Sequence, residues 1–235
     1  MSSKTPLISI LTVSKRTGWE EIAERSIINQ ALLGNTIRQY EWVVVTENPL
    51  VFTEGMARVY QAPKKKQGRL SNLSASVNEG LRHCKGQYVV FYQDFIELDP
   101  GAIEALVMSC EETNGLVSSA CIDHEGNFDS RYTGMDCLRI ALPDEWETNF
   151  AVAPMSILRE LGGSDEEYDY GFAWDNVNIA ERASMLGATV WVNELVRPKL
   201  LYHAKERDIP PNGERHAKTM RAIREGRLPL KLNYL

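Results

Sequence analysis

Residues 87–100 read QYVVFYQDFIELDP, and this segment indicates the architecture of the chain. The uninterrupted apolar and aromatic run 88–92 is typical of a strand that is buried on both faces, as in parallel sheets. Ligands of open α/β sheets bind beyond the carboxyl ends of such strands. Asp94 follows the run directly, so it is a candidate for handling a metal ion or a phosphate. The alternative is an aspartate that accepts backbone N–H bonds in a turn.

Composition and length set broad limits on the class of protein. A chain of 235 residues with 43% hydrophobic and 25% charged residues is typical of one large α/β domain or two joined halves. No apolar stretch approaches the ~20 residues of a transmembrane segment, and no signal peptide is evident, so we expect a cytoplasmic protein. The four cysteines lack Cys-x-x-Cys spacing, which indicates reduced thiols rather than a zinc site.

Strand and helix patterns alternate along the chain. We expect strands at 7–13, 42–45, 58–61, 88–92, 116–122, 149–153 and 189–195. We expect helices at 18–33, 71–81, 100–112, 154–161 and 173–186, the second of them capped by Ser71. This alternation predicts an α/β fold of Rossmann type, with a mixed, mostly parallel sheet and helices on both faces.

Charge is distributed unevenly along the chain. Residues 205–235 hold eight Lys or Arg and four Asp or Glu, a net charge of +4 in a chain whose total is −6. A basic tail on an acidic body is typical of proteins that contact a polyanion or a membrane surface. The alternative is a solvated surface helix that packs back on the body.

Six short motifs occur in an order that is familiar from one enzyme family. They are Ser14-Lys-Arg, Ser26–Gln30, Trp42–Asn48, Asn72–Leu81, Leu161–Glu166 and Tyr170–Asp175. Over roughly residues 7–204 the chain therefore resembles the family 2 glycosyltransferases, which have the GT-A fold. The resemblance implies a nucleotide-sugar-binding half at 1–98, an acceptor-binding half of the same domain at 99–204, and a basic, helical C-terminal tail at 205–235.

The chain departs from the family's acidic motifs at three places. The window Gln93-Asp94-Phe95 stands where the family has Asp-x-Asp, so it resembles a Gln-Asp-hydrophobic variant with a single acid. Thr46 replaces the first acid of the pair that ends at Glu47. Trp174 replaces the Glu of the Glu-Asp pair that ends at Asp175.

The resemblance implies a divalent cation, Mn²⁺ or Mg²⁺, on the diphosphate of a nucleotide-sugar donor. Asp94 would be one ligand, because carboxylates hold these hard cations while phosphates complete the coordination shell. His203 would be another, since a neutral imidazole suits Mn²⁺. The alternative for His203 is an ordinary packed surface histidine.

Further residues are predicted to bind the nucleotide sugar. They are Thr12, Ser14, Glu47, Arg69, Asn72, Gln93 and Asp94. Glu47 could accept the N3–H of uracil or thymine or a ribose hydroxyl, or it could be an ordinary turn acid. Arg69 and the lysines of 64–66 could neutralise phosphates at the N-terminus of the following helix, or they could be solvated.

Asp175 is predicted to be the catalytic base. Transfer of a sugar to a hydroxyl needs a group that removes the acceptor's proton, and a carboxylate at the head of a helix on the acceptor side suits this role. An acid in the first turn of a helix is also favoured by the helix dipole alone. Asp169 and Glu167 are alternative bases. Trp174 and Tyr170 could stack on the acceptor, although core packing would explain such aromatics equally well.

Together these features predict an inverting glycosyltransferase that moves a sugar from a nucleotide-sugar, favoured to be a UDP-sugar, to a hydroxyl. The acceptor would be a glycan or a modified DNA base. One alternative is an inactive nucleotide- or sugar-binding module of the same fold, suggested by the altered motifs. Another is a nucleotidyltransferase, because the segment 14–18 weakly resembles the phosphate-binding loop of those enzymes. The sequence gives no prediction of oligomeric state.

Overall fold

A computed structural model of the protein describes residues 8–33, 40–48, 50, 52–123, 125–127, 132–171, 173–201 and 211–235. Its helices are α1 (Glu20–Leu33), α2 (Leu73–His83), α3 (Ala102–Thr113), α4 (Met155–Leu161), α5 (Asp175–Met185) and α6 (Gly213–Arg224), with 3₁₀ helices η1 (Pro143–Glu145) and η2 (Glu166–Tyr170). Its strands are β1 (Ile8–Ser14), β2 (Tyr40–Thr46), β3 (Arg58–Gln61), β4 (Tyr88–Tyr92), β5 (Ile96–Glu97), β6 (Leu116–Ser119), β7 (Leu138–Ile140), β8 (Phe150–Pro154), β9 (Val190–Asn193) and β10 (Lys199–Leu200).

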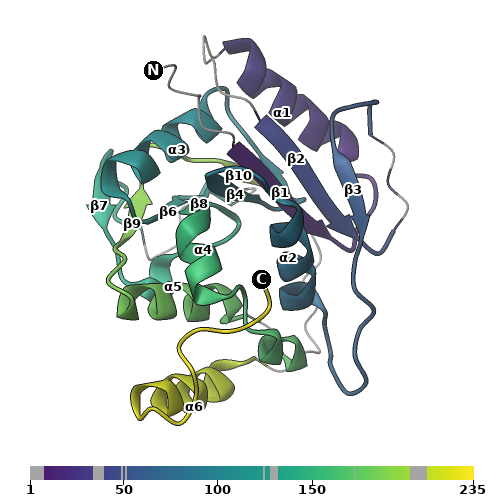
Figure 1. Ribbon diagram of the computed structural model, residues 1–235. Coiled ribbons are helices and arrows are strands. Elements are labelled where there is room, and N and C mark those ends of the chain that lie inside the picture. The colour runs from purple at the N-terminus through teal and green to yellow at the C-terminus, as the bar shows by residue number, and fades with distance from the viewer. Residues whose placement is uncertain are drawn as a thin grey trace, which may run out of the picture.

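Strands from most of the described chain form one large sheet (Figure 1). Its eight strands follow the order β3-β2-β1-β4-β8-β6-β9-β7, and β5 pairs with β10 in a separate ribbon. The pairs among β3, β2, β1 and β4 are parallel, whereas β8 and β7 run antiparallel to their neighbours. The prediction of a mixed, mostly parallel sheet is confirmed.

Helices cover both faces of this sheet, as predicted. Apolar side chains of α2, α4 and α5 pack on one face, on a core that includes Leu11, Val43 and Phe91. Side chains of α1 and α3 pack on the other face, around Ile10 and Val90. Because strand side chains alternate between the two faces, a central strand with both faces covered is expected to be mostly apolar along its whole length, as the run 88–92 is.

Helix α2 lies unusually close to the sheet. A Cβ atom on Gly80 would lie 2.2 Å from Cδ1 of Leu11 in β1, so glycine is required for this approach. The start of α2 differs from the prediction for Ser71. The residue at the N-cap is Asn72, whose side chain makes no capping bond. The backbone N–H groups of Ser74 and Ala75 instead donate to the carboxylate of Asp169, at 2.8 and 3.2 Å.

The basic tail contains helix α6, which packs on the body through His216, Met220, Ala222 and Ile223. Five basic side chains of the tail pair with acids of the chain itself. These ion pairs are Arg215–Glu167, Lys218–Glu214, Arg224–Glu181, Arg227–Glu225 and Lys231–Glu160. Such pairs reduce the positive field that the sequence indicated. Within the described part of the chain, no helix has the length and apolar character needed to cross a membrane.

The segment after α6 is bound along the end of α4. The backbone N–H of Leu232 donates to the carbonyl of Leu161 at 2.8 Å, and that of Tyr234 donates to the carbonyl of Gly162 at 3.1 Å. The buried guanidinium of Arg182 donates to the carbonyls of Leu230, Gly163 and Leu161. Gly162 has a φ of +74°, and a Cβ atom built on it would overlap the carbonyl oxygen of Leu232.

We expect Gly162→Ala to destabilise the protein and to detach residues 228–235 from α4. The substitution combines a left-handed backbone, which costs about 1–2 kcal/mol with a side chain, with a backbone clash. Gly226→Ala is the matched control, because Gly226 has a φ of +72° with nothing within 4 Å of its Cβ position. Thermal unfolding should show a melting temperature at least several degrees lower for Gly162→Ala than for Gly226→Ala. Equal melting temperatures would contradict this docking.

Candidate functional site

The carboxyl ends of β1 and β4 meet at one edge of the sheet. The two strands are parallel neighbours, with Ile8 opposite Tyr88 and Leu11 opposite Phe91. The segment after β4 therefore lies beside the segment after β1. The hydroxyl of Ser14 donates to Oδ2 of Asp94 at 2.5 Å, and Nη1 of Arg16 donates to Oδ1 of Asp94 at 2.6 Å.

Asp94 thus forms an ion pair, an arrangement that differs from both interpretations of the sequence. Its side chain is 4% exposed, and the guanidinium of Arg16 and the hydroxyl of Ser14 engage its two oxygens. The second predicted metal ligand, His203, lies outside the described residues. Among the residues that are described, no three His, Cys, Asp or Glu side chains gather in a group that could hold a metal ion. A divalent cation at Asp94 would compete with Arg16 for the same carboxylate, so the described residues around Asp94 do not fit one.

Arg16 is held firmly although the sequence analysis assigned it no role. Its backbone N–H donates to the hydroxyl of Ser14 at 3.0 Å, and its carbonyl accepts from the indole of Trp19 at 3.1 Å. Its guanidinium lies 5.2 Å from the ring centre of Phe95, and its side chain remains 42% exposed. The signal for Arg16 was its place two residues after the first strand, but its partner is 78 residues away in sequence.

Asp175 begins helix α5 and is partly buried. Burial raises the pKa of its carboxyl to about 6, and the negative charges of Glu147 and Asp169 act in the same direction. The two residues before it, Ala173 and Trp174, have φ angles of 58° and 71°, which residues other than glycine seldom adopt. A carboxylate with a raised pKa beside strained backbone is typical of functional sites.

A small cavity brings Asp175 to the strand ends. The cavity is lined by Asp175, by Val13 near the end of β1, by Gln93 directly after β4 and by Thr148. Its volume of about 20 Å³ is enough for about one water molecule. A larger depression of about 530 Å³ lies between α5 and α6, but none of the residues that line it belongs to a strand end. The small cavity therefore connects the predicted base with the ends of β1 and β4.

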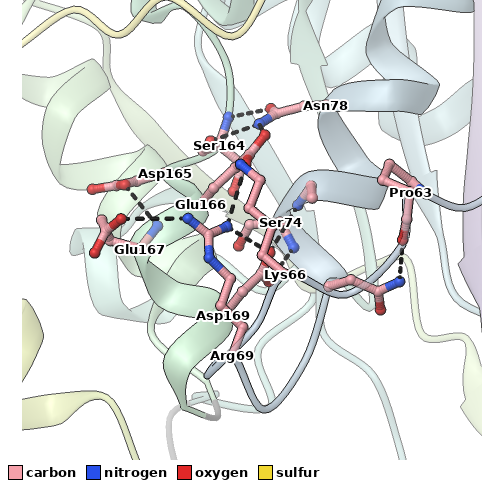
Figure 2. A network of polar contacts seen from close by, with 12 residues as sticks. Pro63, Lys66, Arg69, Ser74, Asn78, Ser164, Asp165, Glu166, Glu167 and Asp169 are labelled. Carbon is pink, nitrogen blue, oxygen red and sulfur yellow. Dashed lines mark hydrogen bonds and ion pairs between the residues drawn. The ribbon is translucent and has the colours of Figure 1, made fainter.

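A buried polar network joins the segment before α2 to the segment before α5 (Figure 2). Arg69 is 8% exposed, and its guanidinium contacts Glu166 at 3.3 Å, Glu167 at 3.4 Å and Asp169 at 3.6 Å. Lys66 also pairs with Glu166, at 2.8 Å. Burial alone would raise the pKa of Glu166, but hydrogen bonds and the charges of Lys66 and Arg69 hold it below its usual range.

This network gives structural roles to three predicted site residues. Asp169 is 1% exposed and binds the start of α2, so it does not face an acceptor. Arg69 is engaged by its three acids. The amide of Asn72 donates to the carbonyl of Pro63 at 2.8 Å, which fixes the loop before α2. A charged residue near a helix start looks the same in sequence whether it binds a ligand or the protein itself.

Of the other residues predicted to bind the nucleotide sugar, some lie in the core and some at the edge of the sheet. Thr12 is fully buried, and its hydroxyl accepts from the indole of Trp42 at 3.0 Å. Glu47 is exposed just after β2, and the neighbouring Asn48 donates to the carbonyl of Lys15 at 2.5 Å. The structure therefore brings the loop of Glu47 to the segment that follows β1, whereas Thr12 is enclosed in the core.

The predicted aromatic platform is only partly exposed. The guanidinium groups of Arg69 and Arg215 both lie over the ring of Tyr170, at 5.3 and 4.9 Å from its centre. Trp174 is 36% exposed, with its ring centre 4.9 Å from that of His216. Of the two, Trp174 directly precedes Asp175 and has surface to offer to a ligand. Phe172 lies outside the described residues.

Comparison with known proteins yields structural neighbours alone. No protein-family model and no curated protein matches the sequence. A mannosyltransferase, PcManGT from Pyrobaculum calidifontis, solved with GDP-Man and Mn²⁺, superposes with a TM-score of 0.62 at 16% identity, over 88% of this chain and 59% of its own. GalNAc-T7, solved with UDP, GalNAc and Mn²⁺, superposes with a TM-score of 0.64 at 12% identity, over 89% of this chain and 46% of its own.

The chain has the GT-A fold. It spans about half of the length of these neighbours, and at such low identity the likeness establishes the fold alone. Membership of family 2 stays a prediction from the motifs.

We expect Asp175→Asn to stabilise the protein at pH 7.5. The folded state raises the pKa of this acid from 3.8 to about 6, so ionisation destabilises the fold as pH rises from about 4 to 6, and the full penalty remains above that range. Removing the charge should raise stability at pH 7.5 by roughly 1–3 kcal/mol and change it little at pH 4. Denaturant unfolding at both pH values checks this, and an equal effect at both would contradict it.

Proposed function

We propose that the protein is an inverting, nucleotide-sugar-dependent glycosyltransferase. The observation that carries this proposal is the cavity in which Asp175, with a pKa of about 6, lies beside Gln93 at the end of β4. The GT-A fold supports it, since both neighbours were solved with nucleotide or nucleotide-sugar ligands. A base with a pKa near 6 is largely ionised at neutral pH and still accepts a proton readily.

Asp175 would act as the base in a single displacement. The acceptor oxygen attacks the anomeric carbon, and its proton passes to the carboxylate of Asp175. The bond from the anomeric carbon to the diphosphate breaks at the same time, and its electron pair leaves with the nucleoside diphosphate. Because the attack comes from the side opposite to the leaving group, the configuration at this carbon is inverted.

The donor would be a UDP-sugar whose base lies near Glu47. This residue is exposed at the end of β2, and Asn48 ties its loop to the loop after β1. A carboxylate there can accept the N3–H of uracil, as the sequence analysis suggested. The Mn²⁺ or Mg²⁺ that was predicted at Asp94 is not part of this proposal, because Arg16 pairs with that carboxylate.

The acceptor would be a glycan hydroxyl rather than a modified DNA base. The DNA alternative drew on the basic tail and on Lys64–Lys66. In the described residues, Arg224 of α6 pairs with Glu181 and Lys66 pairs with Glu166, so much of this charge is compensated within the chain. Trp174 offers an aromatic face for a sugar ring beside Asp175.

We expect the protein to hydrolyse or transfer at least one sugar from a panel of UDP-, GDP- and TDP-sugars, with kcat/KM rising with pH through a midpoint near 6 to a plateau in the neutral range. The rise follows from the need for an ionised Asp175. Asp175→Asn should lower kcat by about 10²–10⁴-fold. Glu147→Gln is the informative companion, since it removes a charge that raises the pKa of Asp175 and should move the midpoint to lower pH.

Binding of nucleotides without turnover of any donor, with glycan acceptors present, would favour the inactive binding module instead. A pH profile that keeps its midpoint in Glu147→Gln would remove Asp175 from the role of base.

We expect the protein to show no DNA binding that falls steeply with salt. Proteins that neutralise several phosphates lose about 10³–10⁵-fold in affinity between 50 and 200 mM salt. Fluorescence anisotropy with a labelled duplex over this range measures the slope. A DNA affinity that falls steeply with salt would favour a modified DNA base over a glycan as the acceptor.

A further inference from the structure

We propose that Arg16 supplies the positive charge that holds the diphosphate of the donor, so that the protein binds its donor without a divalent cation. The inference rests on the proposed function. In this arrangement Asp94 is a positioning residue for Arg16 and does not itself contact the donor.

The position of Arg16 suits this role. It lies two residues after β1, the strand next to β4, at the edge where ligands of open α/β sheets bind. Asp94 lies two residues after β4, so the ion pair stands over the junction of two central strands. Glu47, the proposed contact of the base, follows β2 on the other side of β1.

The guanidinium is preorganised by contacts on several sides. Nη1 of Arg16 donates to Oδ1 of Asp94 at 2.6 Å, and Ser14 holds the other oxygen of that carboxylate at 2.5 Å. The ring of Phe95 lies 5.2 Å from the centre of the guanidinium. The side chain of Arg16 is nevertheless 42% exposed, while that of Asp94 is 4% exposed. A buried carboxylate therefore holds a cation whose outer part faces solvent.

The chemistry of guanidinium matches a diphosphate. Its five N–H donors form a rigid fork that binds phosphate oxygens in pairs, and it stays charged at every relevant pH. It also stabilises the negative charge that develops on the leaving diphosphate, which is the task of a divalent cation in other enzymes.

The guanidinium of Arg16 and a divalent cation cannot both bind the carboxylate of Asp94. A Mn²⁺ or Mg²⁺ ion on Asp94 would lie within a few ångströms of the guanidinium and would have to displace it from Oδ1. Arg69, the other arginine predicted to bind the donor, is already paired with acids of the chain. Arg69 is 8% exposed and meets three acids, so it has little surface for a phosphate.

Calorimetric titration of the full chain with UDP and with GDP tests the proposal, each in EDTA and in Mn²⁺. We expect at least one of the two to bind with a Kd that differs by less than about threefold between the two conditions. Arg16→Gln should weaken binding in EDTA by about tenfold or more, as expected for loss of charge-assisted hydrogen bonds. In Arg16→Gln the carboxylate of Asp94 no longer pairs with a guanidinium, so Mn²⁺ should recover part of that affinity, a gain that the unmodified protein lacks.

Two companion variants sharpen the result. Arg25→Gln is the matched control, because the exposed Arg25 pairs with Glu97 and not with Asp94, so the affinities of this variant should not change. Arg16→Lys keeps the charge but loses the fork, so an intermediate affinity is expected. Circular dichroism and thermal unfolding establish that each variant is folded, and Arg16→Lys provides the measurement if Arg16→Gln does not fold.

Binding that requires Mn²⁺ in the unmodified protein, with Arg16→Gln or Arg16→Lys equal to it, would overturn this inference and leave the proposed function standing. Binding of neither UDP nor GDP in either condition would overturn the proposed function as well. The two failures are therefore distinguishable in one set of titrations.

Discussion

The buried carboxylate of Asp169 is the contact on which the arrangement of the site depends. It accepts the backbone N–H groups of Ser74 and Ala75, so it satisfies the start of α2 from a segment that is about 95 residues away in sequence. The partial positive charge of a helix N-terminus and the guanidinium of Arg69 both stabilise it. Because η2 leads directly to α5, fixing Asp169 also fixes the place where Asp175 enters the cavity, and its charge helps to raise the pKa of Asp175.

The fold was predictable because its signals are local. Apolar runs such as 88–92 mark strands whose two faces are covered, and the intervening periodicity marks the helices that cover them. The antiparallel insertion of β8 beside β4 was not predicted, since strand direction depends on pairing over about 60 residues. The prediction for Ser71 was wrong because an aspartate distant in sequence provides the cap.

The site was predictable only in part, for a physical reason. The sequence located Asp94 and Asp175 at a strand end and a helix start, and the structure places both at those positions. It could not distinguish charges that face a ligand from charges that satisfy the protein, so Arg69 and Asp169 were assigned to binding. It also assigned no role to Arg16, because the role of that residue depends on its ion pair with Asp94, which is distant in sequence.

The small cavity beside Asp175 has a consequence for how a substrate enters. Cavities that bind small molecules measure about 300–1,000 Å³, whereas this one holds about 20 Å³. A sugar ring can therefore reach the carboxylate only if neighbours such as Leu73 or Thr148 move aside. The measured affinity for a donor would then be the intrinsic affinity reduced by the fraction of molecules already open.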